Sequence, residues 1–120
     1  MDIRLYISQH ELYPKKLKLA IKNKRPFAHK ECCRDTKTNC CAFGERFYTE
    51  IMPRLEGFPE EIRQIVLQIE DKHCQFHEIG KKIDIQNPDM ELVKKMEDIT
   101  FEVHKLLLRL EKKLNGLAQD

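Results

Sequence analysis

Residues 59–83 read PEEIRQIVLQIEDKHCQFHEIGKKI and carry the clearest helical pattern in the 120-residue chain. Pro59 suits the first position of a helix, where no backbone N–H is needed, and Glu60 and Glu61 suit the positive end of the helix dipole. An inward face recurs at three- and four-residue steps, at Ile62, Ile65, Val66, Ile69, His73, Phe76, His77 and Gly80. The pattern predicts a long amphipathic helix with two histidines on its buried face.

Two further long helices are predicted on either side of this one. Apolar residues at the same steps predict a helix over 2–24, and Pro14 predicts a kink in it near His10. The turn at 87–89 predicts the start of a last helix that ends near 115–116. The inward residues of the last helix are Val93, Met96, Ile99, Val103, Leu107, Leu110 and Leu114.

The segment between the first two long helices is predicted to be a loop followed by a short helix. Turn and cap residues indicate the loop over 25–39, and the short helix is expected to start near Asn39, carry Cys41 and end before Pro53. No segment alternates with period two for long enough to make a strand. We therefore predict an all-α fold, an antiparallel, four-helix-bundle-like arrangement of three long helices plus the short one, as a single domain over 1–120.

The composition excludes several classes of protein. The 22 Lys+Arg and 20 Asp+Glu leave a net charge of +2, which indicates no particular charged partner. Basic residues gather over 15–30, but no aromatic residues alternate with them, so a solvated helix face is favoured over a nucleic-acid site. No apolar run approaches the ~20 residues of a membrane span, and the N-terminus does not resemble a signal peptide. We expect a cytoplasmic protein without nucleic-acid binding or membrane insertion, whose five cysteines stay reduced and serve metal or redox chemistry.

Three of the five histidines are expected to face one core. His73 and His77 are four residues apart, which places both imidazoles on one helix face, and His10 lies on the inward face of the first helix. Buried imidazoles need partners because each carries a ring N–H and a lone pair. Zinc answers this need, since it accepts imidazole nitrogen and thiolate in a tetrahedron at about 2.0–2.3 Å.

The cysteines supply candidates for a fourth zinc ligand. Cys41 begins the short helix, where free backbone N–H groups and the helix dipole favour a thiolate. Cys74 neighbours a histidine and is expected to turn off the ligand face. A rival site of Cys32, Cys33, Cys40 and Cys41 lacks the C-x-x-C spacing of structural zinc sites. We interpret Cys32, Cys33 and Cys40 as loop thiols, in preference to an oxidative disulfide among them.

Three short motifs together resemble the CZB (chemoreceptor zinc-binding) domain family. In chain order they are His10-Glu11-Leu12-Tyr13, Cys41-Ala42-Phe43-Gly44 and His73-Cys74-Gln75-Phe76-His77, with separations close to those of the family. Position by position, the resemblance implies that the zinc ligands are His10, Cys41, His73 and His77. Arg46 stands where many members have a tryptophan, a departure that concerns local packing and not ligation.

The resemblance implies a regulatory domain of bacterial signal transduction, of the chemotaxis or cyclic-di-GMP type. CZB domains are cytoplasmic helical bundles, commonly homodimers, and are usually fused to chemoreceptors or diguanylate cyclases. They couple zinc, or oxidation of the zinc-bound cysteine, to signalling output. The chain has no room for an output domain, so we expect either a free-standing sensor that acts through a partner or a fragment of a longer protein. The ligand set leaves open whether zinc is sensed, redox-switched or purely structural.

Three alternative functions share the predicted histidine core. A metal hydrolase is disfavoured because four protein ligands leave no position for water and residue 74 is not the Glu of H-E-x-x-H, so we expect no enzyme activity. A hemerythrin-like di-iron bundle needs carboxylate ligands, but Asp71 and Glu78 are expected to face away from the histidine pair. His29 and His104 are interpreted as surface or boundary residues. A non-sensing structural zinc interaction module needs the same ligands as the sensor.

Overall fold

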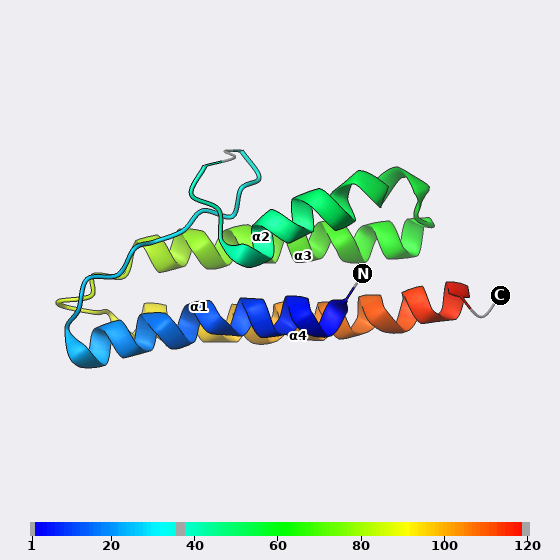
Figure 1. The fold of residues 1–120 in the computed structure, drawn as a ribbon. Coiled ribbons are helices and arrows are strands. Elements are labelled where there is room, and N and C mark those ends of the chain that lie inside the picture. The colour runs from blue at the N-terminus through cyan, green and yellow to red at the C-terminus, as the bar shows by residue number, and fades with distance from the viewer. Residues whose placement is uncertain (1, 36–37, 119–120) are drawn as a thin grey trace.

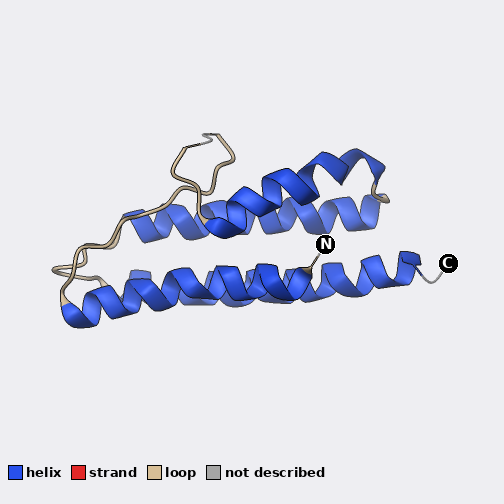
Figure 2. Ribbon diagram, viewed as in Figure 1, coloured by secondary structure: helices blue, strands red, loops and turns tan. Residues whose placement is uncertain are grey.

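The computed structural model describes residues 2–35 and 38–118, and every regular element in this part of the chain is helical (Figure 1). The long helices are α1 (Ile3–Asn23), α3 (Glu60–Lys81) and α4 (Met90–Ala118). Three short pieces lie between α1 and α3, namely α2 (Ala42–Arg46), η1 (Phe47–Ile51) and η2 (Met52–Gly57). Figure 2 shows loops and helices, and within the described residues a lone β-bridge between Glu31 and Cys40 is the single strand-like pairing. The prediction of an all-α chain is confirmed.

Helix α1 begins and ends one residue inside the predicted bounds of 2–24, and it continues through Pro14. Asp2 caps its start, because the carboxylate accepts a hydrogen bond from the backbone N–H of Leu5 at 3.2 Å. Lys24 ends it in the left-handed conformation, with φ of 51°. The buried residues of the helix are Ile3, Tyr6, His10, Leu17 and Ala20. The inward face predicted from the sequence thus brings His10 into the core.

Helical turns continue past Pro53, which corrects the prediction that this proline ends the short helix. The α-helical geometry stops at Arg46, and one π-helical turn, η1, precedes the 3-10 turns of η2. Pro53 lies in the first turn of η2, where a missing N–H and a fixed φ are tolerated. Phe47 and Ile51 are fully buried, so these turns are anchored on the core.

Helices α3 and α4 lie close to their predicted bounds. Pro59 takes the N-cap position of α3, one residue before the helix. The carboxylate of Asp89 accepts a hydrogen bond from the backbone N–H of Glu91 at 3.0 Å, which fixes the start of α4. Within the residues that the structure describes, no helix combines the length and the apolar character that a bilayer crossing requires.

The three long helices lie side by side, and the molecule measures 52 × 25 × 19 Å (Figure 1). Helix α4 packs against both α1 and α3, and α2 packs on α1. One core cluster contains Ile3, Tyr6, Cys41, Phe43, Phe47, Ile51, Ile62, Ile65, Val66, Ile69, Val103, Leu107 and Leu110. A second contains Leu17, Phe76, Ile83, Val93 and Met96. Along α3, His73 lies between the residues of the two clusters, and along α1 His10 does the same.

Candidate metal centre

Three buried side chains bring their donor atoms together where α2 begins against α3. Sγ of Cys41 lies 3.2 Å from Nε2 of His73, and the same nitrogen lies 3.2 Å from Nε2 of His77. All three donor atoms lie within 4.8 Å of one another. Neighbouring ligands on one tetrahedral ion with bonds of 2.0–2.3 Å are about 3.3–3.6 Å apart. These three residues therefore lie close enough to bind a single metal ion.

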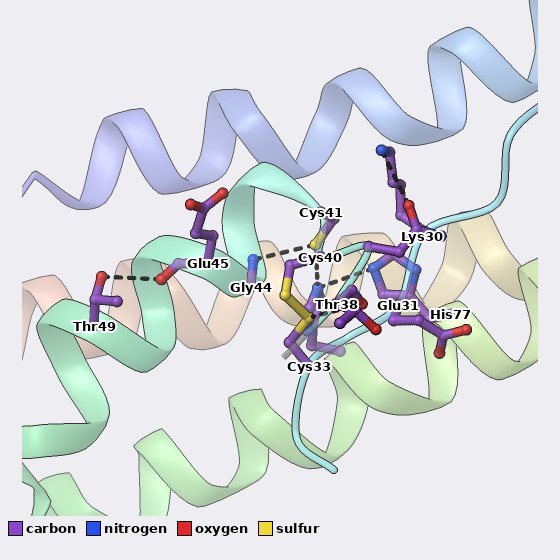
Figure 3. Close-up of a disulfide and its surroundings, with 12 residues drawn as sticks. Lys30, Glu31, Cys33, Thr38, Cys40, Cys41, Gly44, Glu45, Thr49 and His77 are labelled. Carbon is purple, nitrogen blue, oxygen red and sulfur yellow. Dashed lines mark hydrogen bonds between the residues drawn. A yellow bond between two sulfur atoms is a disulfide. The ribbon is translucent and has the colours of Figure 1, made fainter. Parts of the chain in front are cut away.

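Cys41 reaches this position because it is the N-cap of α2. Its backbone is extended, with φ of −72° and ψ of 159°, and its sulfur accepts a hydrogen bond from the backbone N–H of Gly44 at 3.1 Å (Figure 3). A side chain at an N-cap points back over the first helical turn. The cap thus fixes the direction of the sulfur toward α3.

Gly44 is required at this point by the close approach of three neighbours. A Cβ on this residue would lie 2.7 Å from the carbonyl oxygen of Cys32 and 3.3 Å from both Sγ of Cys41 and Cε1 of His73. The first of these contacts is shorter than van der Waals packing allows, and it involves backbone. The glycine of the C-x-F-G motif therefore lets the loop and α2 close over the donor atoms.

Aromatic rings surround the two histidines of α3. The ring centroid of Phe43 lies 4.6 Å from that of His73, and the rings of Tyr13 and Phe76 lie 4.9 and 5.1 Å from that of His77. Close packing on these faces restricts rotation of the imidazoles. Tyr13, the aromatic residue three positions after His10, thus packs against His77 and forms part of the wall of the centre.

Burial keeps the imidazoles of the centre neutral. Desolvation lowers the pKa of His10 to about 3 and the pKa of His77 to about 4, from the ordinary value of 6.5. Desolvation also lowers the pKa of His73, and the neighbouring imidazoles add to the effect. A neutral imidazole keeps the lone pair that metal ligation needs.

Cys41 differs from the sequence expectation of a thiolate. Desolvation raises the pKa of its thiol to about 11, which outweighs the opposing hydrogen bond from the Gly44 N–H. The helix that it caps has only five residues, so few aligned peptide dipoles stabilise a negative charge there. Without metal the side chain is a thiol at neutral pH, and metal binding has to displace its proton.

His10, the fourth predicted ligand, lies beside the group of three donors and not within it. Its ring centroid is 5.6 Å from that of His73 and 4.6 Å from that of Phe76. The residue is 2% exposed, and neither ring nitrogen has a hydrogen-bond partner among the described residues. A buried polar group without a hydrogen-bond partner costs about 1–3 kcal/mol of stability. A polar or metal partner for the ring nitrogens of His10 would therefore be stabilising.

His104, which the sequence analysis interpreted as a surface or boundary residue and not as a neighbour of the centre, lies next to His10. The two ring centroids lie 5.8 Å apart, and Nδ1 of His104 is 3.7 Å from a carboxylate oxygen of Glu11. Its Nε2 is buried with no hydrogen-bond partner in the described part of the chain. His104 comes close to His10 because α4 packs on α1, and the spacing of residues along one helix does not predict this contact. His29 lies outside the centre, with Nδ1 3.5 Å from the hydroxyl of Tyr13.

Cys33 and Cys40 form a disulfide bond (Figure 3). This finding corrects the interpretation that favoured free loop thiols, and it removes the rival four-cysteine site, which needs both sulfurs as thiolates. Cys33 and Asn39 adopt positive φ angles of 69° and 58°, which turn the loop back on itself. The backbone N–H of Cys41 also donates a hydrogen bond to the carbonyl of Glu31 at 3.1 Å. The chain just before Cys41 is thus fixed by a covalent bond and by a backbone hydrogen bond.

Comparison of the chain with models of protein families, with curated proteins and with solved structures gave no match. The chemistry of the centre therefore has to be inferred from its own residues. Those residues offer two imidazole nitrogens and one sulfur within reach of one ion, and a third imidazole beside them.

Proposed function

We propose that the protein is a zinc-binding regulatory domain of the CZB type, with a centre built from Cys41, His73, His77 and His10. The convergence of three buried donor atoms from α2 and α3 carries the proposal. Such a centre holds the short helix against the long one, because a ligand from each contributes to it. We also propose that the chain forms an antiparallel helical bundle over 1–120 and that it pairs as a homodimer, as CZB domains commonly do.

The donor set favours zinc over a di-iron centre. Thiolate and neutral imidazole suit zinc, whereas iron pairs in helical bundles need several carboxylates. The carboxylate residues nearest in sequence to the histidine pair are Asp71 and Glu78, and both are exposed. Neither belongs to the group of donors that lie within reach of one ion.

His10 is the side chain that best completes the centre. Two imidazoles on one tetrahedral ion have ring centroids about 5 Å apart, and those of His10 and His73 are 5.6 Å apart. A fourth protein ligand leaves no open position for a water molecule, so the centre supports a role in regulation and not in hydrolysis. Binding would also satisfy one of the two unpartnered ring nitrogens of His10.

Signalling would follow from release of α2. Loss of zinc, or oxidation of Cys41, removes the bond that holds the start of α2 on α3, and the surface offered to a partner changes. A chemoreceptor or a diguanylate cyclase, fused or separate, is the class of output protein that we propose. Sensing of zinc and sensing of oxidants both use this same step.

The test is metal content combined with ligand substitution. Elemental analysis of the purified full chain is expected to give one zinc per chain, and Ala substitution of Cys41, His73, His77 or His10 should weaken zinc binding by more than about tenfold. His29→Ala is the matched control, because His29 is a histidine outside the centre and should keep the parental affinity. Two irons per chain, or parental zinc affinity in Cys41→Ala, would refute the proposal.

The depth of the centre favours a second candidate, a non-sensing structural zinc module. His73 and His77 are 1% and 2% exposed, and buried ligands exchange metal slowly. Transfer of zinc to a chelator within minutes at neutral pH supports a sensor, whereas retention over hours supports the structural module.

A further inference from the structure

Two free cysteines, Cys32 and Cys74, lie beside His77 of the candidate metal centre. Both line a small cavity of about 110 Å³, together with Cys33 of the disulfide. Burial and the neighbouring thiol of Cys32 raise the pKa of the Cys74 thiol, as expected for two side chains that lie next to each other. Cys32 belongs to the loop before α2, and Cys74 to the middle of α3, so the pair joins segments that are 42 positions apart in the chain.

The two thiols differ in access. Cys74 is 2% exposed, whereas Cys32 is partly exposed at the wall of the cavity. An accessible thiol with a second thiol in contact behind it is the arrangement in which one sulfur is attacked first and the other resolves the product. Cys41, the third free cysteine, is buried and is held by the Gly44 N–H.

We propose that Cys32 and Cys74 are an oxidisable pair that forms a second disulfide by exchange with small-molecule disulfides such as oxidised glutathione. The bond would tie the loop to α3 next to His73. It lies beside the metal centre and uses none of its donors.

The exchange takes two balanced steps. In the first, the sulfur of Cys32 attacks one sulfur of the small disulfide, loses its proton to solvent, and releases one small thiol. In the second, the sulfur of Cys74 attacks Sγ of Cys32 in this mixed disulfide, loses its proton, and releases the second small thiol. Two protein thiols are oxidised to one disulfide, and one small disulfide is reduced to two thiols.

The consequence for the centre rests on the proposed function. The carbonyl oxygen of Cys32 is the atom that closes over Gly44, so the loop that carries Cys32 also confines the cap that holds Cys41. A bond from Cys32 to Cys74 would keep this loop on α3 and slow the opening through which a metal ion leaves. Oxidised protein should therefore lose zinc to a chelator several-fold more slowly than reduced protein.

The experiment maps thiols in the metal-free full chain after incubation with excess oxidised glutathione. Unfolding without reductant, alkylation and peptide mass spectrometry are expected to show alkylatable cysteines falling from three to one, with Cys32 joined to Cys74 and Cys41 still free. Since this reaction needs no metal, failure to bind zinc would overturn the proposed function and leave the cross-link standing. A cross-link without slower zinc loss would overturn the regulatory consequence alone.

Two variants test the order of the steps, with circular dichroism to confirm that each is folded. Cys74→Ala should accumulate glutathione on Cys32, because the resolving sulfur is missing. Cys32→Ser should leave Cys74 unmodified, because it is buried. In the parent protein, stable glutathione on Cys32 beside a free Cys74, or a bond from Cys32 to Cys41, would overturn the proposal.

Discussion

The backbone N–H of Gly44 donates a hydrogen bond to Sγ of Cys41 across 3.1 Å. The same glycine leaves no room for a side chain, since a Cβ would meet the carbonyl oxygen of Cys32 at 2.7 Å. The direction of the sulfur and the closure of the loop over it therefore depend on one residue without a side chain.

Gly44→Ala should weaken both the fold and the metal centre. The added methyl group forces the loop away from α2, at a cost of about 1–3 kcal/mol in the free energy of unfolding. Urea unfolding and a competition assay for zinc measure the two effects. Gly57→Ala is the matched control, because a Cβ there meets nothing within 4 Å. Equal zinc affinity in the two variants would contradict the role given to Gly44.

Stability of the metal-free protein should fall as the pH drops below 6.5. The folded pKa of His77 is about 4 and that of His10 about 3, so between these values and 6.5 the unfolded chain binds more protons than the folded one. The stabilisation is fully present above 6.5 and is lost toward the folded pKa values, by about 1.4 kcal/mol per pH unit for each histidine. Urea unfolding at several pH values measures the slope. His77→Gln should reduce it, and a flat profile from pH 7 to 5 would argue against buried neutral imidazoles.

Zinc binding should release one proton per ion at neutral pH. Burial raises the pKa of Cys41 to about 11, so its thiol has to ionise on ligation, whereas the histidines are already neutral. Affinity is therefore expected to rise about tenfold per pH unit between pH 7 and 8.5. Calorimetry in buffers of different ionisation enthalpy counts the protons. A count of zero would mean that Cys41 is either ionised beforehand or not a ligand.

Removal of zinc should lower the melting temperature. Zinc at a hundred times its dissociation constant stabilises the folded state by about 2.7 kcal/mol, which corresponds to roughly 10 °C for a domain of this size. Thermal melts with and without a strong chelator measure the shift. Cys74→Ala should keep it and Cys41→Ala should lose it, because both cysteines are buried and only the second belongs to the donor group. Identical melts of the parent in both buffers would mean that no ion couples to folding.

The sequence predicted the parts of the centre that local spacing determines. His73 and His77 share a helix face because an α-helix repeats every 3.6 residues. The sequence also placed Cys41 at the start of the short helix, where the structure has it as the N-cap of α2. A disulfide among the loop cysteines was the disfavoured alternative, because the pairing of Cys33 with Cys40 depends on two left-handed residues in an irregular loop.

Tertiary packing decides the features that the sequence did not predict. The raised pKa of the Cys41 thiol arises from burial under neighbouring elements, which outweighs the cap. His104 approaches His10 through the packing of α4 on α1. The spacing of residues along one helix predicts neither the raised pKa of Cys41 nor the contact between His104 and His10.

The π-helical turn η1 determines which changes of length this segment tolerates. Phe43, Phe47 and Ile51 recur every four residues and are all buried, which keeps one face of α2 and η1 on the core. A π-helical turn holds one residue more than the α-helical turn that could replace it, so deleting one residue within η1 leaves the flanking turns in register. Inserting one residue would instead rotate everything before it by about 100° around the axis. The sulfur at residue 41 would then swing away from α3, so an insertion here should abolish metal binding while leaving the long helices intact, whereas a one-residue deletion should not.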